Sequence, residues 1–171
     1  MITIHTLVIA CGNPLRGDDG VGPAAANIVQ SWQMPGVKVR SVHQLVPELI
    51  EEMKHVERVL FIDAGANAEE SAFQTCTLEP TASRRCFGHH ETPANLLALL
   101  HALEGRVPQA WLVSISAHSF DHGEEITAEA HDHLRAALAW IRAFLAAPSG
   151  VPTIFSTWEG KKPCRPATTS I

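Results

Sequence analysis

Apolar stretches alternate with stretches of helical periodicity along most of the chain. Unbroken or alternating apolar runs predict strands, because a strand buried on both faces of a sheet has no polar face. The predicted strands are Thr6–Cys11, Val37–Val42, Arg58–Ala64, Ser71–Leu78 and Ala110–Ile115. Apolar positions at helical spacing, with proline or threonine near the start, predict the helices between them. These helices begin near Val21, Gln44, Thr92 and Thr127 and end near Gln33, His55, Leu103 and Ala147.

Helices that follow strands one by one predict an α/β fold. We expect a doubly wound, mostly parallel twisted sheet of about five strands, with right-handed crossovers and helices on both faces. The strand Thr6–Cys11 should be central, between the Val37 and Arg58 strands, and Ser71–Leu78 should be a short antiparallel edge strand. Residues 1–147 then form a single α/β domain. Residues 148–171 are rich in Pro, Thr, Ser and Lys and are expected to be a flexible tail.

Composition narrows the class of protein. The chain has 171 residues, is 46% hydrophobic and carries a net charge of −5, which disfavours nucleic acid and anionic membranes as partners. No apolar run approaches the roughly 18 residues of a membrane span, and no basic segment precedes an apolar one at the start. The four cysteines form no C-x-x-C pair, which fits a reducing compartment better than a disulfide scaffold or a zinc finger. We therefore expect a cytoplasmic protein.

The segment Gly12–Gly22 joins the first strand to the first helix, the place where α/β proteins bind ligands. It is not a P-loop, because the Lys and Ser/Thr that contact phosphate and magnesium are missing. Asp18 and Asp19 stand there instead and would repel a phosphate. The Rossmann glycine pattern is also absent. An acidic glycine loop suits a cation or a hydrogen-bond donor; the alternative is that Asp18 or Asp19 only caps the helix at Val21.

Two carboxylates should meet at the carboxyl ends of adjacent strands. Asp19 follows the first strand and Asp63 ends the third, and neighbouring strands lie about 4.8 Å apart. Like charges that close need a cation or a shared proton. His89 or His90 could add an imidazole, a set that suits a first-row divalent metal with open positions. The alternatives are that Asp63 only accepts backbone amides and that both histidines are solvated.

A second group of histidines lies further along the chain. We expect these to be surface residues: His118, His122, His131 and His133.

Several motifs resemble the [NiFe]-hydrogenase maturation proteases. They are Gly12-Asn13-Pro14-x-x-Gly17-Asp18-Asp19-Gly20-Val21-Gly22, Gln44-Leu45-x-Pro47-Glu48-Leu49, Phe61-Ile62-Asp63-Ala64 and His89-His90-x-x-Pro93-x-x-Leu96-Leu97. The resemblance covers residues 5–146. It implies a phosphorylase/hydrolase-like fold and an endopeptidase that removes the C-terminal extension of the hydrogenase large-subunit precursor after nickel insertion.

The resemblance also implies the site. Asp19, Asp63 and His89 would bind the metal, with His90 as the alternative third ligand. The nickel would be supplied by the substrate, with no permanently bound cofactor, although another divalent metal can occupy such a site. Gly12, Asn13, Asp18 and His90 are expected to contact the substrate.

No catalytic group apart from the metal site is evident, since no Ser-His-Asp or Cys-His arrangement and no His-Glu-x-x-His helix is present. The nickel, or a water on it, would polarise and attack the scissile carbonyl. We expect a monomer that acts on the large-subunit precursor, without nucleic acid or membrane partners.

Two other functions stay open. Peptidyl-tRNA hydrolases share a strand followed by Gly-Asn-Pro, but they need a basic site for RNA, whereas this loop carries Asp18 and Asp19. A nickel-sensing maturation chaperone could use the same ligands without catalysis, and only an activity assay separates it from a protease.

Overall fold

The computed structural model describes residues 3–65, 71–81 and 91–147. Their strands form one sheet in the order β2-β1-β3-β5-β4. The strands are β1 (Thr6–Cys11), β2 (Val37–Val42), β3 (Arg58–Gly65), β4 (Phe73–Leu78) and β5 (Gln109–Ser116). β1, β2, β3 and β5 pair in parallel, whereas β4 pairs antiparallel with β5 at the edge of the sheet. The predicted fold class, the placement of β1 between β2 and β3, and the antiparallel edge are confirmed.

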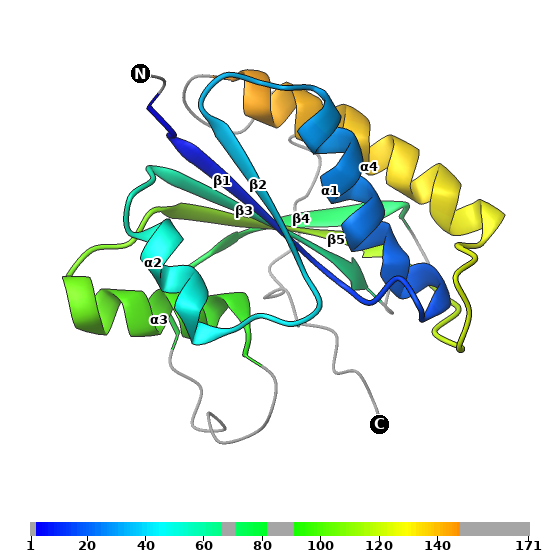
Figure 1. Ribbon diagram of the computed structural model, residues 1–171, viewed down its shortest axis with the longest axis horizontal. Coiled ribbons are helices and arrows are strands. Elements are labelled where there is room, and N and C mark those ends of the chain that lie inside the picture. The colour runs from blue at the N-terminus through cyan, green and yellow to red at the C-terminus, as the bar shows by residue number, and fades with distance from the viewer. Residues whose placement is uncertain (1–2, 66–70, 82–90, 148–171) are drawn as a thin grey trace.

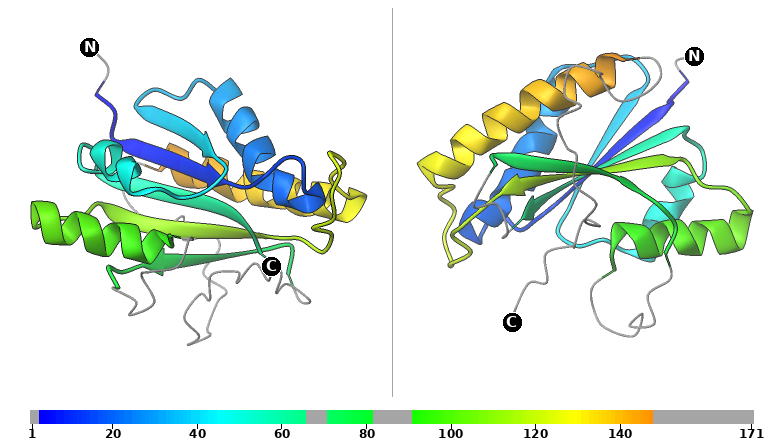
Figure 2. Two further views of the ribbon diagram at one scale, coloured as in Figure 1. Left: turned by 60° about the horizontal axis from the view of Figure 1, so that its bottom comes forward. Right: turned by 180° about the vertical axis from the view of Figure 1, so that it is seen from behind.

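Helices cover both faces of the sheet (Figures 1 and 2). The α-helices are α1 (Val21–Ser31), α2 (Ile50–Met53), α3 (Pro93–Glu104) and α4 (Ala128–Ala146). Two short 3-10 helices, η1 (Gly17–Gly20) and η2 (Pro47–Leu49), precede α1 and α2. One core lies between the sheet and α1 with α4, and a second lies between the sheet and α2 with α3. The alternation of side chains along each strand divides them between the two cores.

Threonine side chains fix the starts of two helices. Thr92 Oγ1 accepts a hydrogen bond from Asn95 N, and Thr127 Oγ1 accepts one from Ala130 N, both at 3.2 Å. Each threonine satisfies a backbone amide that has no partner within the first turn. The predicted starts near residues 92 and 127 are thereby confirmed, with each threonine as the cap that precedes its helix.

The second predicted helix is shorter than expected. Only Pro47–Met53 is helical, as one 3-10 turn followed by four α-helical residues. The proline can stand at the first helical position, but the residue before it is held in extended backbone, so the helix cannot begin earlier.

Two further observations bear on the expectations from composition. In the described part of the chain, no helix is long and apolar enough to cross a membrane. Cys11 is a free thiol, whereas Cys76 is disulfide-bonded, so the expectation of reduced cysteines is wrong for Cys76. Residues 148–171, the predicted tail, lie outside the described residues.

Candidate active site

Two glycines let the loop after β1 fold back on the end of that strand. Gly12 has φ +149°, and a Cβ built there would lie 2.1 Å from the backbone oxygen of Asp19. A Cβ at Gly22 would lie 2.0 Å from the backbone oxygen of Cys11. No side chain fits at either distance, so both positions require glycine. The close approach places Asp19 directly over the carboxyl end of β1.

Asp18 joins this loop to the loop that follows β5. Its side chain is fully buried and accepts four hydrogen bonds. The donors are His118 N (3.1 Å), Ser119 N (3.1 Å), Thr127 N (2.8 Å) and Thr127 Oγ1 (3.1 Å). The same two loops exchange backbone hydrogen bonds, and they lie side by side at the start of α1 (Figure 1). Asp18 therefore acts as a structural clasp between them.

The electrostatics of Asp18 follow from these donors. Burial by itself raises the pKa of this carboxyl group, but the hydrogen bonds from Thr127, His118 and Ser119 outweigh burial and lower the pKa below its ordinary value. The ionised form is stabilised by protein groups alone. Contact between Asp18 and substrate stays a prediction, and in this structure the carboxylate faces protein donors.

Asp19 is half-buried and keeps part of its carboxylate free. Its Oδ2 accepts a hydrogen bond from Asn13 N at 2.8 Å, and its Oδ1 receives none from the described residues. The hydrogen bond to Asn13 N holds the carboxylate against the turn Gly12–Pro14. Neither aspartate caps α1, whose first residues have no side-chain cap. The simpler interpretation of the Asp18-Asp19 pair as a helix cap is therefore wrong.

Asp63 stands beside Cys11 on the α2–α3 face of the sheet. Ala10 pairs with Ile62 in the β1–β3 register, so the next residues, Cys11 and Asp63, are level with each other. Two residues earlier, Ile9 and Phe61 belong to the core under α2 and α3, and side chains two apart share a face. The two predicted metal-binding carboxylates therefore lie at the same end of the sheet, although 44 residues separate Asp19 from Asp63.

The pKa of Asp63 is raised to about 7. Burial is the main cause, and the charge of Asp19 adds to it, while the hydrogen bond from Ala64 N to Oδ1 (2.9 Å) works in the opposite direction. Oδ2 receives no hydrogen bond from the described residues. Asp63 thus ends a buried strand with a charge that the described protein groups stabilise only weakly.

The Cys11 thiol responds to the same two carboxylates. Burial, followed by the charges of Asp63 and Asp19, raises its pKa to about 12. Its Sγ donates to the backbone oxygen of His43 at 3.6 Å. The thiol is therefore protonated at neutral pH and is a poor nucleophile, because the thiolate is the reactive form.

The third predicted ligand cannot be placed, since His89 and His90 lie outside the described residues. Within residues 3–65, 71–81 and 91–147, no three His, Cys, Asp or Glu side chains are grouped closely enough to hold a metal ion. Asp19 and Asp63 fit two positions of such a site. Each has a carboxylate oxygen that receives no hydrogen bond from the described residues, and the repulsion between the two carboxylates favours an added cation.

The second histidine group lies on the loop after β5 and on α4. His118, His122 and His131 are exposed, as predicted. His133 differs, because it is half-buried and its Nδ1 lies 3.0 Å from the backbone oxygen of Ser116. An Nδ1–H group that donates to this oxygen explains the position of the ring without a ligand.

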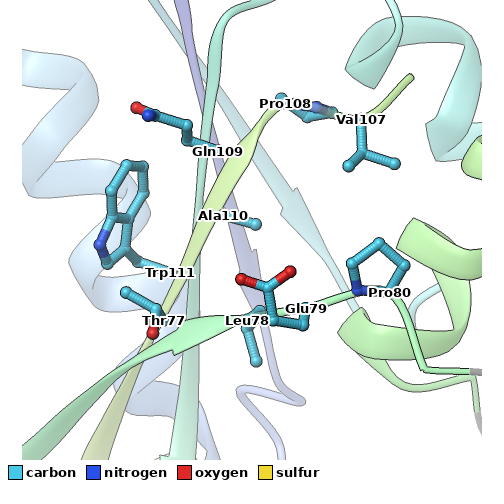
Figure 3. Close-up of a pocket in the computed structure, with 9 residues that line it drawn as sticks. All are labelled: Thr77, Leu78, Glu79, Pro80, Val107, Pro108, Gln109, Ala110 and Trp111. Carbon is cyan, nitrogen blue, oxygen red and sulfur yellow. The ribbon is translucent and has the colours of Figure 1, made fainter.

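A cavity of about 310 Å³ opens at the other end of the sheet (Figure 3). It is lined by the end of β4, the start of β5 and the residues beside them, among them Glu79, Val107 and Trp111. This is the amino end of β5, whereas Asp63 lies level with Ser114 near its carboxyl end. The cavity is therefore separate from the acidic site.

Sequence reasoning overlooked two neighbours of Asp63. Neither Cys11 nor Ser114 was predicted as part of the site, although Ser114 pairs directly with Asp63 across β3 and β5. The available signal was a polar residue near the carboxyl end of an otherwise apolar strand, the same signal that pointed to Asp63.

The fold is similar to that of [NiFe] hydrogenase maturation proteases of known structure, and this similarity establishes the fold. The HybD endopeptidase from E. coli aligns with a TM-score of 0.65 and 18% identity, covering 82% of this chain and 91% of that chain. HybD from Thermococcus kodakarensis aligns with a TM-score of 0.63 and 22% identity, covering 82% of this chain and 99% of that chain. A hydrogenase 2 maturation peptidase from Thaumarchaeota archaeon SCGC_AB-539-E09 aligns with a TM-score of 0.62 and 22% identity, covering 83% of this chain and 98% of that chain. Neither a protein-family model nor a curated protein matches the sequence.

Proposed function

We propose that the protein is an endopeptidase that removes the C-terminal extension of a [NiFe]-hydrogenase large-subunit precursor after nickel has been inserted. The observation that carries this proposal is that Asp19 and Asp63 lie at the same end of the sheet, each with a carboxylate oxygen that no described residue donates to. The shared fold with solved maturation proteases and the motifs around both acids support the assignment.

Asp19 and Asp63 would bind the nickel that the precursor carries, with His89 or His90 as the third ligand. Nickel is therefore part of the substrate, and no permanently bound cofactor is needed. Binding the ion would place the scissile peptide beside the two carboxylates, where the metal or its water can polarise the carbonyl. A precursor without nickel lacks the group that the acids recognise, so nickel acts as a signal that insertion is complete. We place this activity in the cytoplasm, with the enzyme as a monomer.

The direct test is to incubate the protein with nickel-loaded and nickel-free precursor and to measure the mass of the large subunit. We expect the loss of a C-terminal peptide only from the nickel-loaded form. Cleavage of both forms would remove nickel recognition from the proposal, and cleavage of neither would overturn the protease assignment in favour of the nickel-sensing chaperone.

A tRNA-binding measurement tests the other alternative. Two acids and a net charge of −5 predict weak binding, because phosphate contacts need Lys and Arg. Tight binding that weakens steeply with salt would favour a peptidyl-tRNA hydrolase.

A further inference from the structure

A lateral row of polar side chains begins at Asp63 and crosses the sheet to its edge. Asp63 on β3 pairs with Ser114 on β5, and Ser114 pairs with Gln74 on β4. One step earlier on the same face, the corresponding row is Phe61, Leu112 and Cys76, which lie in or against the core under α2 and α3. The face therefore changes from apolar to polar at the row that contains Asp63.

Gly65 leaves room for the Ser114 hydroxyl group. A Cβ built at Gly65 would lie 2.0 Å from Ser114 Oγ, so any side chain at this position would displace the hydroxyl. The backbone of Gly65 does not have a positive φ, so the requirement for glycine here is steric and not conformational. The missing side chain lets the Ser114 hydroxyl group lie against the backbone of Gly65.

Within the described part of the chain, the hydrogen-bonding groups of the Ser114 and Gln74 side chains have no partner. Ser114 is half-buried and Gln74 is exposed, and neither side chain forms a hydrogen bond with the residues that the structure describes. A serine hydroxyl and a glutamine amide both donate and accept, so they match the alternating N–H and C=O groups of a peptide backbone. Neither carries a charge that would select a charged ligand.

The spacing also fits an extended peptide. Adjacent strands lie about 4.8 Å apart, so the row spans roughly 10 Å from Asp63 to Gln74. An extended chain advances about 3.3 Å per residue and covers this length with three residues.

We propose that Ser114 and Gln74 form a ledge that binds, in extended conformation, the substrate residues on one side of the scissile bond. The inference depends on the proposed protease function and names two positioning residues for it. Ser114 would hold the backbone next to the bond that is cut, and Gln74 would hold it about two residues further away. The absence of a side chain at Gly65 lets the Ser114 hydroxyl keep its position.

The test is steady-state cleavage of nickel-loaded precursor by Ser114→Ala, Gln74→Ala and the double variant. Loss of one hydrogen bond should raise KM by about threefold to tenfold for each variant, with a smaller change in kcat, since the acids are untouched. Matched controls are Ser41→Ala on β2 and Gln109→Ala at the other end of β5, both exposed. The controls should keep the wild-type KM, and thermal unfolding should show that all variants fold.

The outcomes separate the two proposals. Wild-type cleavage with a double variant whose KM is within twofold of wild type would overturn the ledge and leave the protease assignment intact. The absence of cleavage by the wild-type protein would overturn both. A rise in KM for the ledge variants and not for the controls supports the ledge.

Discussion

Asp18 and Asp63 are two poorly exposed carboxylates at the same end of one sheet, and their surroundings are opposite. From the residues that the structure describes, Asp18 accepts four hydrogen bonds, which lower its pKa. Asp63 accepts one from these residues, and burial raises its pKa to about 7. A buried charge that is fully hydrogen-bonded holds structure together. A buried charge that is weakly hydrogen-bonded and lies near a second carboxylate is a place for a cation. The comparison gives Asp18 a structural role and supports the proposed metal-binding role of Asp63.

Removal of Asp18 should have the largest effect on stability. Asp18→Ala leaves the amides of His118, Ser119 and Thr127 without their acceptor, and we expect a loss of about 3–5 kcal/mol in the free energy of unfolding. Urea unfolding measures this loss. Asp121→Ala is the matched control, because Asp121 is exposed on the loop after β5 that carries His118 and Ser119. This substitution should change stability by less than about 0.5 kcal/mol. Equal effects of the two substitutions would show that Asp18 does not hold the two loops together.

The close approach of the loop to β1 should be nearly as sensitive. Gly12→Ala places a Cβ against the backbone of Asp19 at a positive φ, and the loop must shift. We expect a loss of about 2–4 kcal/mol. Gly123→Ala is the control, since nothing lies within 4 Å of a Cβ at that position and the residue stands in the loop that pairs with Gly12–Gly20. A stable Gly12→Ala protein would show that the loop is not held as described.

Asp63→Asn should change stability in the opposite direction from Asp18→Ala. The folded protein holds a proton on Asp63 up to about pH 7, whereas the unfolded chain loses it near pH 3.8. Wild-type stability should therefore fall as pH rises through this window. The variant lacks the charge, so it should be more stable than wild type by about 1–3 kcal/mol at pH 8 and similar to it near pH 4. The free energy of unfolding of both proteins, measured at pH 4 and pH 8, tests this prediction. A variant that is less stable than wild type at pH 8 would contradict the raised pKa of Asp63.

The smallest expected effect is a change in the pKa of Asp63 when a metal ion binds, measured by titrating the two carboxyl groups. Carbon NMR of the metal-free protein should show that Asp63 titrates near pH 7 and that the pKa of Asp18 lies below the ordinary value of an aspartate. Added Zn²⁺, a diamagnetic substitute for nickel, should lower the pKa of Asp63, since a bound cation favours the charged form. We expect at least a tenfold change in the proton affinity of Asp63, or about 1.4 kcal/mol. If the Asp63 carboxyl group ionises below pH 5 without metal, its pKa is not raised and the contrast with Asp18 is wrong.

The sequence was sufficient for the fold and for the position of Asp63, because both follow from local patterns. Unbroken apolar runs defined β1 and β3, and an acid at the end of such a run must stand at the carboxyl edge of the sheet. The role of Asp18 could not be predicted, because its donor Thr127 is 109 residues away and no local pattern encodes that contact. Ser114 carries a local signal, a polar residue near the end of an apolar strand, but its pairing with Asp63 on another strand could not be predicted from that signal.

The measurement that tests the central claim most directly is the cleavage of nickel-loaded precursor by wild type, Asp63→Asn and Asp19→Asn in parallel, followed by mass spectrometry. If both acids bind the nickel of the substrate, each variant should fold and neither should release the C-terminal peptide. An Asp63→Asn protein that cleaves at the wild-type rate would contradict the account.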